Sequence, residues 1–553
     1  MSTGVRVEYG YVTPNAKENF KPMATDVAIF ANIEQLMTPQ LIFPNYGNPC
    51  EQFETSLDGN SVVLPSNPNK ANLGLWSSQL SGSDGIFDEP IVLTLTSAQK
   101  YTIPGISLLF DVLNDIYANH INIQFYEGDI LLDDEDFYPN SSNWHMEKII
   151  QNLNKIVITF YSLNMPYNRL NLRVIEYGYG IMFGSDSLRS VKIIQEINPV
   201  SSEISINTAD ILLDTGTQGE LLFQKKQPLS IYRDEQLKAT VFVEKTKRKS
   251  QRLWSFSCND YIGLLEGVSF VGGMYVNKNA SDLVAEIFST AKIPYELDGR
   301  FAEVIVSGYI PYTNCREALM QVAFAIQAMV DTSNSDVVKI YEPNDEVTQT
   351  VALSRIMEGQ SFERDDVVTA VEVSAHFYRA ISEEAEVYNA ENDGIGDNIF
   401  IKFNEPLHSL NIINGEILAF GVNYAKINAF VGCLLTGLKY EHTTVTKRKD
   451  NPRILANDIE NIVIVDNATL VSASNVDKVL ERCYNYYANQ DSAKMKIVES
   501  KHNIDGEIIY DKVTNVGDMI KFETSYSGEK TGRIIKQTFN LAGGITIKDT
   551  VVR

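Results

Sequence analysis

Strict alternation of apolar and polar residues recurs along this chain and constrains its fold more than any other feature. It is clearest in "IVLTLT" at residues 91–96, "INIQFY" at residues 121–126 and "IVITFY" at residues 156–161. Successive side chains of a β-strand point to opposite faces, so a two-residue period predicts half-buried strands. Asn, Gly and Pro separate these runs at the spacing of a β-sandwich. The alternation therefore predicts a mainly β protein.

The length of 553 residues predicts several domains, because single hydrophobic cores stop growing well below that size. We expect a jelly-roll β-sandwich followed by two antiparallel β-barrels, with an α+β insertion between the barrels. The expected parts are an N-terminal extension or docking segment at 1–66, the sandwich at 67–180, the first barrel at 181–270, the insertion at 271–350, and the second barrel, with an inserted helix and C-terminal strands, at 351–553.

The segment 67–180 resembles the discoidin-like or galactose-binding-like jelly roll in "ISLLFD", "INIQFYEGD" and "KIVITF…MPYNRLNLRVIEYG", although it lacks the disulfide usual in that family. The resemblance implies loops at one end that bind glycans or lipid headgroups. Trp76 and Trp144 are the candidate glycan contacts, because a flat, exposed aromatic face stacks on a sugar ring. Tryptophan beside apolar residues is more often part of the core, which is the competing interpretation.

An acidic run, "EGDILLDDEDFY", follows the second of these strands. Its carboxylates could bind calcium, which prefers oxygen ligands. The run lacks the spacing and the glycine of an EF-hand loop, so a solvated acidic turn is the favoured interpretation.

Five basic residues gather at a predicted turn between two strands of the first barrel: Lys245, Lys247, Arg248, Lys249 and Arg252. The chain as a whole is acidic, with 47 Lys and Arg against 71 Asp and Glu and a formal net charge of −24. This balance argues against a protein that binds nucleic acid by neutralising phosphates. Two interpretations of the turn stay open: it forms salt bridges with a neighbouring subunit, or it is a solvated hairpin tip.

The most apolar stretch is "GYIPYTNCREALMQVAFAIQAMV" at residues 308–330. Its helical part, residues 314–330, contains Arg316, Glu317 and two glutamines, which are costly in hydrocarbon. Asn314 and Glu317 instead form a capping-box pattern at the start of an amphipathic helix. We therefore expect a buried core helix of the insertion and no membrane span.

Within the second barrel, "DDVVTAVEVSAHFYRAI" at residues 365–381 predicts a strand that pairs with "AEVYNAE" at residues 385–391. A helix is expected from its apolar face, and "VGDMIKFET…GEKTGRIIKQTFNL" predicts a hairpin that turns at Gly528. The face of the helix consists of Val476, Val479, Leu480, Cys483, Tyr484 and Tyr487.

No catalytic or cofactor motif is found: there is no zinc-protease helix, phosphate loop, nucleophile elbow or dinucleotide fingerprint. The chain begins without a secretory signal pattern. Its cysteines lie far apart, which predicts free thiols in a protein made in a reducing cytoplasm. They are Cys50, Cys258, Cys315, Cys433 and Cys483. We expect no enzyme, no cofactor and no metal site.

Three strings together resemble the tail hub proteins of bacteriophages: "VFVEKTKRKSQRLWSFSCNDYIGLLEG", "GGMYVNKNASDLVAEIFSTAKI" and "SGYIPYTNCREALMQVAFAIQAMV". The resemblance covers about residues 185–553. It implies two tube-like barrels flanking the insertion, and a homotrimer that imitates the sixfold ring of the tail tube. The implied partners are the tail tube or a distal tail protein and a tip spike or fibre protein, with DNA passing without specific binding. The implied location is the virion tail baseplate or tip, after synthesis in the bacterial host cytoplasm.

Two alternatives to a tail hub remain. One is an adhesin that binds host cell-wall glycan through the sandwich. The other is a tail-associated wall hydrolase, which the absence of a catalytic motif disfavours.

Overall fold

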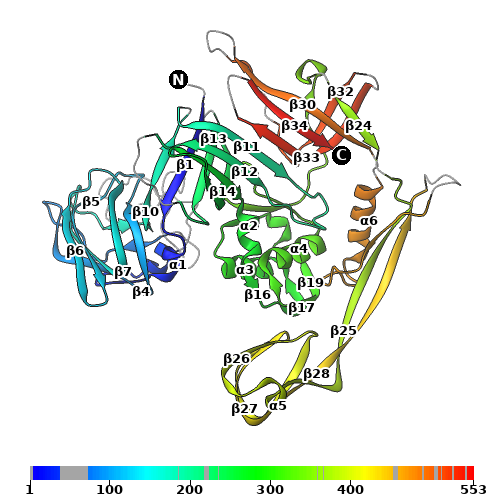
Figure 1. Ribbon diagram of the computed structural model, residues 1–553, viewed down its shortest axis with the longest axis horizontal. Helices are drawn as coiled ribbons and strands as arrows, with labels where there is room; N and C mark the ends of the chain where they lie inside the picture. Colours follow the sequence, from blue (N-terminus) through cyan, green and yellow to red (C-terminus); the bar gives the residue numbers. More distant parts are fainter. Residues whose placement is uncertain are drawn as a thin grey trace.

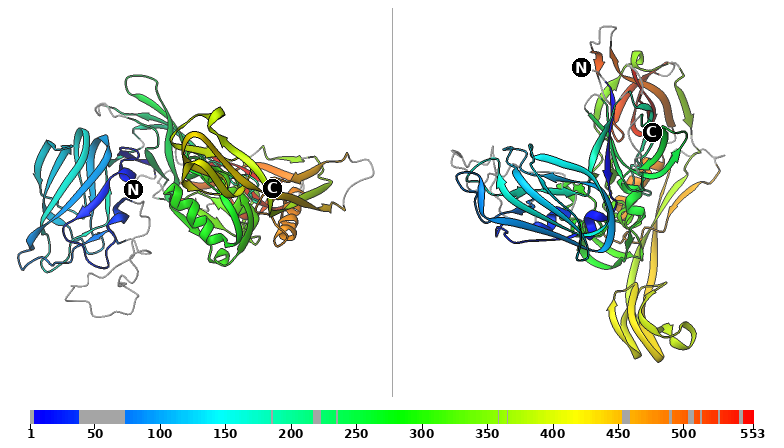
Figure 2. Two further views of the ribbon diagram at one scale, coloured as in Figure 1. Left: turned by 90° about the horizontal axis from the view of Figure 1, so that it is seen from below. Right: turned by 60° about the vertical axis from the view of Figure 1, so that its left-hand side comes forward.

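The computed structural model describes residues 4–37, 73–184, 186–216, 223–233, 236–357, 359–364, 366–452, 459–488, 491–502, 508–511, 514–525, 528–541 and 545–553. Strands make up 58% of it and helices 13%, which confirms the predicted mainly β class. Figures 1 and 2 show an N-terminal β-layered part, a central part that combines a large sheet with helices, and a long β-ribbon that reaches away from both.

The N-terminal part is an antiparallel sheet in the order β2-β4-β7-β5-β6, with β9 beside β4. β4 and β7 pair over two stretches, up to Thr96 and from Gly105 of β4, and the register shifts between them. Both halves of β4 face one core, because Leu95 and Ile106 are fully buried in the same cluster. The resemblance to the discoidin-like jelly roll stays a prediction. The strands are β2 Lys21–Ala24, β4 Ile86–Leu109, β5 Ala118–Glu127, β6 Ile130–Phe137, β7 Asn143–Leu163 and β9 Val174–Glu176.

The chain before this sheet is divided between two parts of the molecule. β1 (Val5–Val12) lies between β10 (Gly178–Phe183) and β13 (Pro228–Arg233) in the large sheet. Ala16, at the start of α1 (Ala16–Asn19), and the neighbouring Phe20 are buried in the core of the N-terminal part. Residues expected in a docking extension therefore contribute to both parts; positions 38–66 of that extension lie outside the described residues.

The large sheet has fourteen strands, and its first half follows the order β10-β1-β13-β14-β15-β12-β11. Phe183 of β10 and Val191 of β11 lie at opposite ends of this row, yet both belong to one buried cluster. The first half is therefore curled around its own core. The strands not yet given are β11 Leu188–Glu196, β12 Thr208–Asp214, β14 Gln236–Arg248 and β15 Leu253–Asn259.

β33 joins this row directly to the second half of the sheet. It pairs antiparallel with β11, from Lys192↔Asn540 to Glu196↔Lys536. The second half surrounds a separate core that contains Ile497, Ile520 and Ile534. The two predicted barrels are thus curled halves of one continuous sheet, and no pairing between described strands closes either half into a ring. The strands here are β23 Val347–Val351, β24 Ser361–Arg364, β30 Asp491–His502, β31 Ile508–Asp511, β32 Met519–Thr524, β33 Gly528–Asn540 and β34 Ile545–Val552.

The predicted C-terminal hairpin is confirmed: β32 and β33 pair antiparallel, with Thr524 opposite Gly528. β33 extends beyond this hairpin, and its later residues pair with β34 on one side and with β11 on the other.

The helices α2 (Tyr261–Glu266), α3 (Ala280–Ala291) and α4 (Cys315–Ile326) pack together with short strands below the first half of the sheet (Figure 1). The predicted cap is confirmed, because the Asn314 side chain accepts a hydrogen bond of 2.8 Å from the Glu317 amide. The helix ends earlier than expected: Gln327 adopts φ 63°, and the chain then enters β21 (Met329–Asp331). No helix among the described residues is long and apolar enough to cross a membrane.

The ribbon, here called the arm, consists of β25 (Ala370–Asn389) and β28 (Tyr424–Asp450), and it carries a small sheet at its far end. The expected pairing of residues 365–381 with 385–391 is wrong, because both stretches belong largely to β25 and pair with β28 instead. At the root of the arm, α6 (Val476–Tyr487) covers β25, and Val371 and Val373 share a core with Val479. The far sheet contains β26 Gly396–Lys402 and β27 Leu407–Phe420, beside α5 Ala390–Asp393.

Four cysteines are free, as predicted, and all four are buried: Cys258, Cys315, Cys433 and Cys483. Cys50 lies outside the described residues.

Candidate functional site

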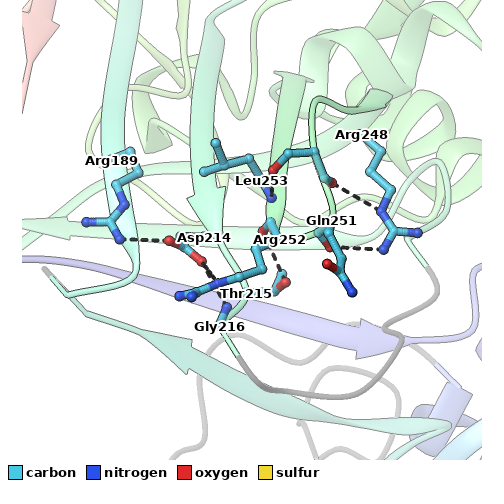
Figure 3. Close-up of polar contacts among 9 residues, drawn as sticks. Arg189, Asp214, Thr215, Gly216, Arg248, Gln251, Arg252 and Leu253 are labelled. Carbon is cyan, nitrogen blue, oxygen red and sulfur yellow. Dashed lines mark hydrogen bonds and ion pairs between the residues drawn. The ribbon is translucent and has the colours of Figure 1, made fainter.

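The five basic residues of the predicted turn lie at the end of the antiparallel pair β14–β15. Figure 3 shows the two arginines among them, Arg248 and Arg252. The side chains of all five are exposed. Hydrogen bonds close the turn itself: the Lys249 amide donates to the Leu253 carbonyl at 2.8 Å, and the Leu253 amide donates to Ser250 Oγ at 3.1 Å. The structure therefore brings the predicted residues together on one ordered hairpin, here called the basic hairpin.

The two arginines of the basic hairpin are engaged within the chain. Arg252 Nε contacts Asp214 Oδ1 at 3.0 Å. Arg248 donates to the backbone carbonyls of Ser250 at 3.3 Å and Gln251 at 2.9 Å, and its guanidinium lies 5.4 Å from the centre of the Trp254 ring. These contacts hold the turn in shape, and both arginine side chains stay exposed.

Asp214, at the end of β12, anchors the hairpin to the neighbouring strands (Figure 3). Arg189 donates to its Oδ2 at 2.7 Å and the Gly216 amide donates to its Oδ1 at 3.0 Å. These hydrogen bonds, the one from Arg189 first, lower the pKa of Asp214 to about 2. The carboxylate therefore stays charged at any pH near neutrality. The Thr215 amide adds a bond of 2.9 Å to the Arg252 carbonyl.

The three lysines of the hairpin, in contrast, have no carboxylate partner among the described residues. A register shift between Val243 and Lys245 interrupts the pairing of β14 with β15. Val243 before the shift is buried, whereas Lys245 and Lys247 after it lie opposite Ser257 and Ser255 and are exposed. Three unpaired ammonium groups can bind carboxylates or phosphates of another molecule.

The structure separates the two candidate tryptophans. Trp76 is fully buried, its Nε1 donates to the Leu73 carbonyl at 3.0 Å, and Phe30 packs edge-on against it. The glycan-contact interpretation is therefore wrong for Trp76, because no ring face is accessible. The sequence could not show this, since Ala28, Phe30 and Ala31, which pack on Trp76 together with Leu73, lie more than 40 residues earlier in the chain.

Trp144 is half-buried on β7, with its ring centre 5.3 Å from that of Phe137. It lines a pocket of about 480 Å³ together with Glu135, Glu147 and Lys148. The glycan-contact role of Trp144 stays a prediction.

The acidic run lies mostly on β6, an edge strand, and not in a turn. Lys148 pairs with Asp133 at 2.6 Å and with Glu135 at 2.7 Å. Asn122 and Gln124 donate to Asp134, and these bonds lower the pKa of that carboxyl. Within the described part of the chain, no group of three or more potential metal ligands is gathered.

A further surface, at the far end of the arm, was not predicted. Seven large apolar side chains are exposed there: Ile395, Phe400, Ile413, Leu418, Phe420, Phe430 and Val431. Adjacent apolar residues, such as Ile412 and Ile413, were the sequence feature that could have indicated this surface. Two neighbouring residues of a strand point to opposite faces, so such pairs place apolar groups on both faces.

Comparison with known proteins gives structural similarities only. No protein-family model matches the chain, and no curated protein matches it. A tail protein from Neisseria meningitidis MC58 is 11% identical, with a TM-score of 0.42, over 66% of this chain and 92% of that one.

Two prophage proteins give similar values. The 43 kDa tail protein of prophage MuSo2 from Shewanella oneidensis is 8% identical, with a TM-score of 0.42, over 68% of this chain and 95% of that one. The prophage tail protein gp18 from Listeria monocytogenes EGD-e is 9% identical, with a TM-score of 0.37, over 67% of this chain and 91% of that one. Similarities at this level assign no function to the chain.

Proposed function

We propose that this chain is a structural protein of a bacteriophage tail or of a phage-tail-like particle. In this proposal it forms a homotrimeric hub that joins the tail tube to the baseplate or tip spike. The observation that carries the proposal is the continuous sheet formed when β33 pairs with β11, which sets two curled, mainly antiparallel halves side by side in one chain. The three hub-like strings of the sequence lie in the first half and the helical insertion that follows it.

Two curled halves per chain explain why a trimer suits this role. Three copies supply six halves, which is the number needed to continue a sixfold tube with a threefold protein. The net charge of −24 suits the wall of a channel for DNA, because like charges repel phosphates and favour passage without specific binding.

The proposed partners are a tail tube or distal tail protein on one side and a tip spike or fibre protein on the other. The proposed location is the tail tip or baseplate of the particle. The N-terminal part and the arm reach outward from the large sheet (Figure 1), so both could contact other tail components. The proposal gives this chain no enzymatic step and no cofactor.

The second candidate function is glycan binding by the N-terminal part. The half-exposed Trp144 beside its pocket of about 480 Å³ is the one feature that favours it. Binding of host cell-wall polysaccharide that is lost in Trp144→Ala would support this function, and binding unaffected by that change would exclude Trp144 as the contact.

The oligomeric state tests the hub proposal. Light scattering of the purified chain across a concentration series should give about three times the chain mass of 62.0 kDa. Chemical cross-linking of assembled particles should give the same trimer, and it covers the case in which trimers form only during assembly. A monomer in both measurements would refute the hub.

A further inference from the structure

A pocket of about 690 Å³ lies where three parts of the molecule meet. The helical insertion contributes Arg300 and Phe301, α6 at the root of the arm contributes Lys478 and Arg482, and the second half of the sheet contributes Arg533. A ligand bound here would contact all three parts at once.

The pocket is lined by five basic and three acidic side chains, and each of the three acids already has a basic partner. Arg300 pairs with Glu342, Arg533 pairs with Asp345, and Lys449 pairs with Glu481. Among the described residues, the acidic side chains of the pocket therefore pair with neither Lys478 nor Arg482.

Arg482 has one guanidinium nitrogen without a hydrogen-bond partner among the described residues. This nitrogen, Nη1, is buried, whereas Nη2 donates to the Pro199 carbonyl. Burial lowers the pKa of Arg482 to about 10, although the carboxylates of Asp345 and Glu342 act in the opposite direction. A buried donor without an acceptor is costly, and a small rotation of the Arg482 side chain, which lines the pocket, would present this donor to a ligand oxygen.

Lys478 lies four residues before Arg482 on α6 and therefore on the same face of the helix. Its side chain is exposed, and no described carboxylate pairs with it. Phe301 and Ile326 form an apolar wall of the same pocket. Two cationic groups beside an apolar wall suit a ligand with a charged head and a hydrocarbon body.

We infer that this pocket binds a carboxylate ligand, with its oxygens at Arg482 and Lys478 and its hydrocarbon part against Phe301 and Ile326. A carboxylate fits better than a phosphate, because the nearby Glu342 and Asp345 repel a dianion more strongly than a monoanion. The ligand is either a free carboxylic acid or an acidic side chain of a neighbouring polypeptide. Since α6 packs on β25, occupancy would fasten the root of the arm to the sheet.

Isothermal titration of the full chain in phosphate-free buffer tests this inference with three probes. They are hexanoate, a peptide blocked at both ends that contains a single glutamate, and inorganic phosphate. We expect saturable binding of a carboxylate probe with a dissociation constant below about 1 mM. Tighter binding of hexanoate would point to a free acid, and tighter binding of the peptide to a polypeptide. Tightest binding of phosphate, or saturable binding of no carboxylate probe, would overturn the inference.

Variants localise the site. Arg482→Met should weaken carboxylate binding at least about tenfold, because one charge-assisted hydrogen bond is lost. Lys478→Met, which changes an exposed side chain and should fold normally, should weaken it by about threefold or more. Arg379→Met on the arm makes the same change of residue type far from the pocket and should bind as the natural chain does. Unchanged affinity in both pocket variants would refute the assignment.

Discussion

The buried carboxylate of Asp260 ties the large sheet to the helical insertion, and its titration should control the stability of that junction. The side chain is 1% exposed. It caps α2 by accepting from the amides of Ile262 at 3.0 Å and Gly263 at 3.3 Å. It also accepts from the Asn207 amide at 3.1 Å, at the start of β12, and from the Thr332 hydroxyl in the insertion.

Burial outweighs these hydrogen bonds and raises the pKa of Asp260 from 3.8 to about 6. The folded state therefore binds this proton more tightly than the unfolded state. The contribution of protonated Asp260 to the free energy of unfolding is therefore fully present below pH 3.8 and is lost as the pH rises through about 6. A shift of about two pKa units corresponds to about 3 kcal/mol. Asp260→Asn has no titrating proton at this site. Its side-chain amide faces the Asn207 amide and cannot accept every hydrogen bond that the carboxyl group accepts. The variant should therefore be less stable than the natural chain by about 1–3 kcal/mol at low pH.

Between pH 4 and pH 7.5 the natural chain should therefore lose about 2.5 kcal/mol of stability relative to Asp260→Asn, so its advantage at low pH disappears or reverses in sign. Hydrogen exchange of the peptide that covers residues 260–266 measures the opening free energy of this junction directly. Asp282→Asn, an exposed carboxyl on α3, is the matched control and should follow the natural chain at every pH. A pH-independent difference between the natural chain and Asp260→Asn would refute the reasoning.

Three further predictions concern the basic hairpin, the root of the arm and a close backbone approach. Changing Lys245, Lys247 and Lys249 to Glu should leave the midpoint of thermal unfolding nearly unchanged, because these side chains are exposed. The same change should weaken self-association of the chain at low salt. Light scattering at two ionic strengths measures the association, with Arg379→Glu as the control. Equal association of both variants would exclude the hairpin from the subunit contact. His376, whose Nδ1 lies 2.9 Å from His442 Nε2, has a pKa lowered by burial and by His442, so the arm root should lose stability as the pH falls below 6.5. In the natural chain, hydrogen exchange along β25 should show faster opening at pH 5.5 than at pH 7.5. In His376→Gln the opening rate should depend less on pH. The same pH dependence in both chains would contradict the role given to His376. Gly308→Ala should cost more than about 1 kcal/mol in denaturant unfolding, because φ is +149° and the new Cβ would lie 2.2 Å from the Thr469 carbonyl oxygen. Gly299→Ala, with no atom within 4 Å of its new Cβ, should be nearly neutral, and equal costs for the two changes would refute this explanation.

Features that depend on near neighbours in the chain were predictable from sequence. The Asn314 cap and the buried stripe of α4 are contained within one helix, and the hairpin at Gly528 joins strands that follow each other directly. The basic hairpin was predicted for the same reason, since β14 and β15 are consecutive.

Its division into two engaged arginines and three free lysines was not predictable. That division depends on Asp214 and Arg189 from other strands and on one register shift in β14. A shift of one residue exchanges the two faces of a strand, and the amino-acid pattern alone does not mark where it occurs.

Local periodicity and composition are enough to predict that this protein is mainly β, that its apolar stretch at 308–330 contains a capped core helix, and that its cysteines in the described part are unpaired. Three features could be read only from the folded chain: the two expected barrels form one sheet, β25 belongs to an arm, and Trp76 is buried. Each of these depends on contacts between distant segments, such as β11 with β33, where many pairings satisfy the same alternation and packing selects one.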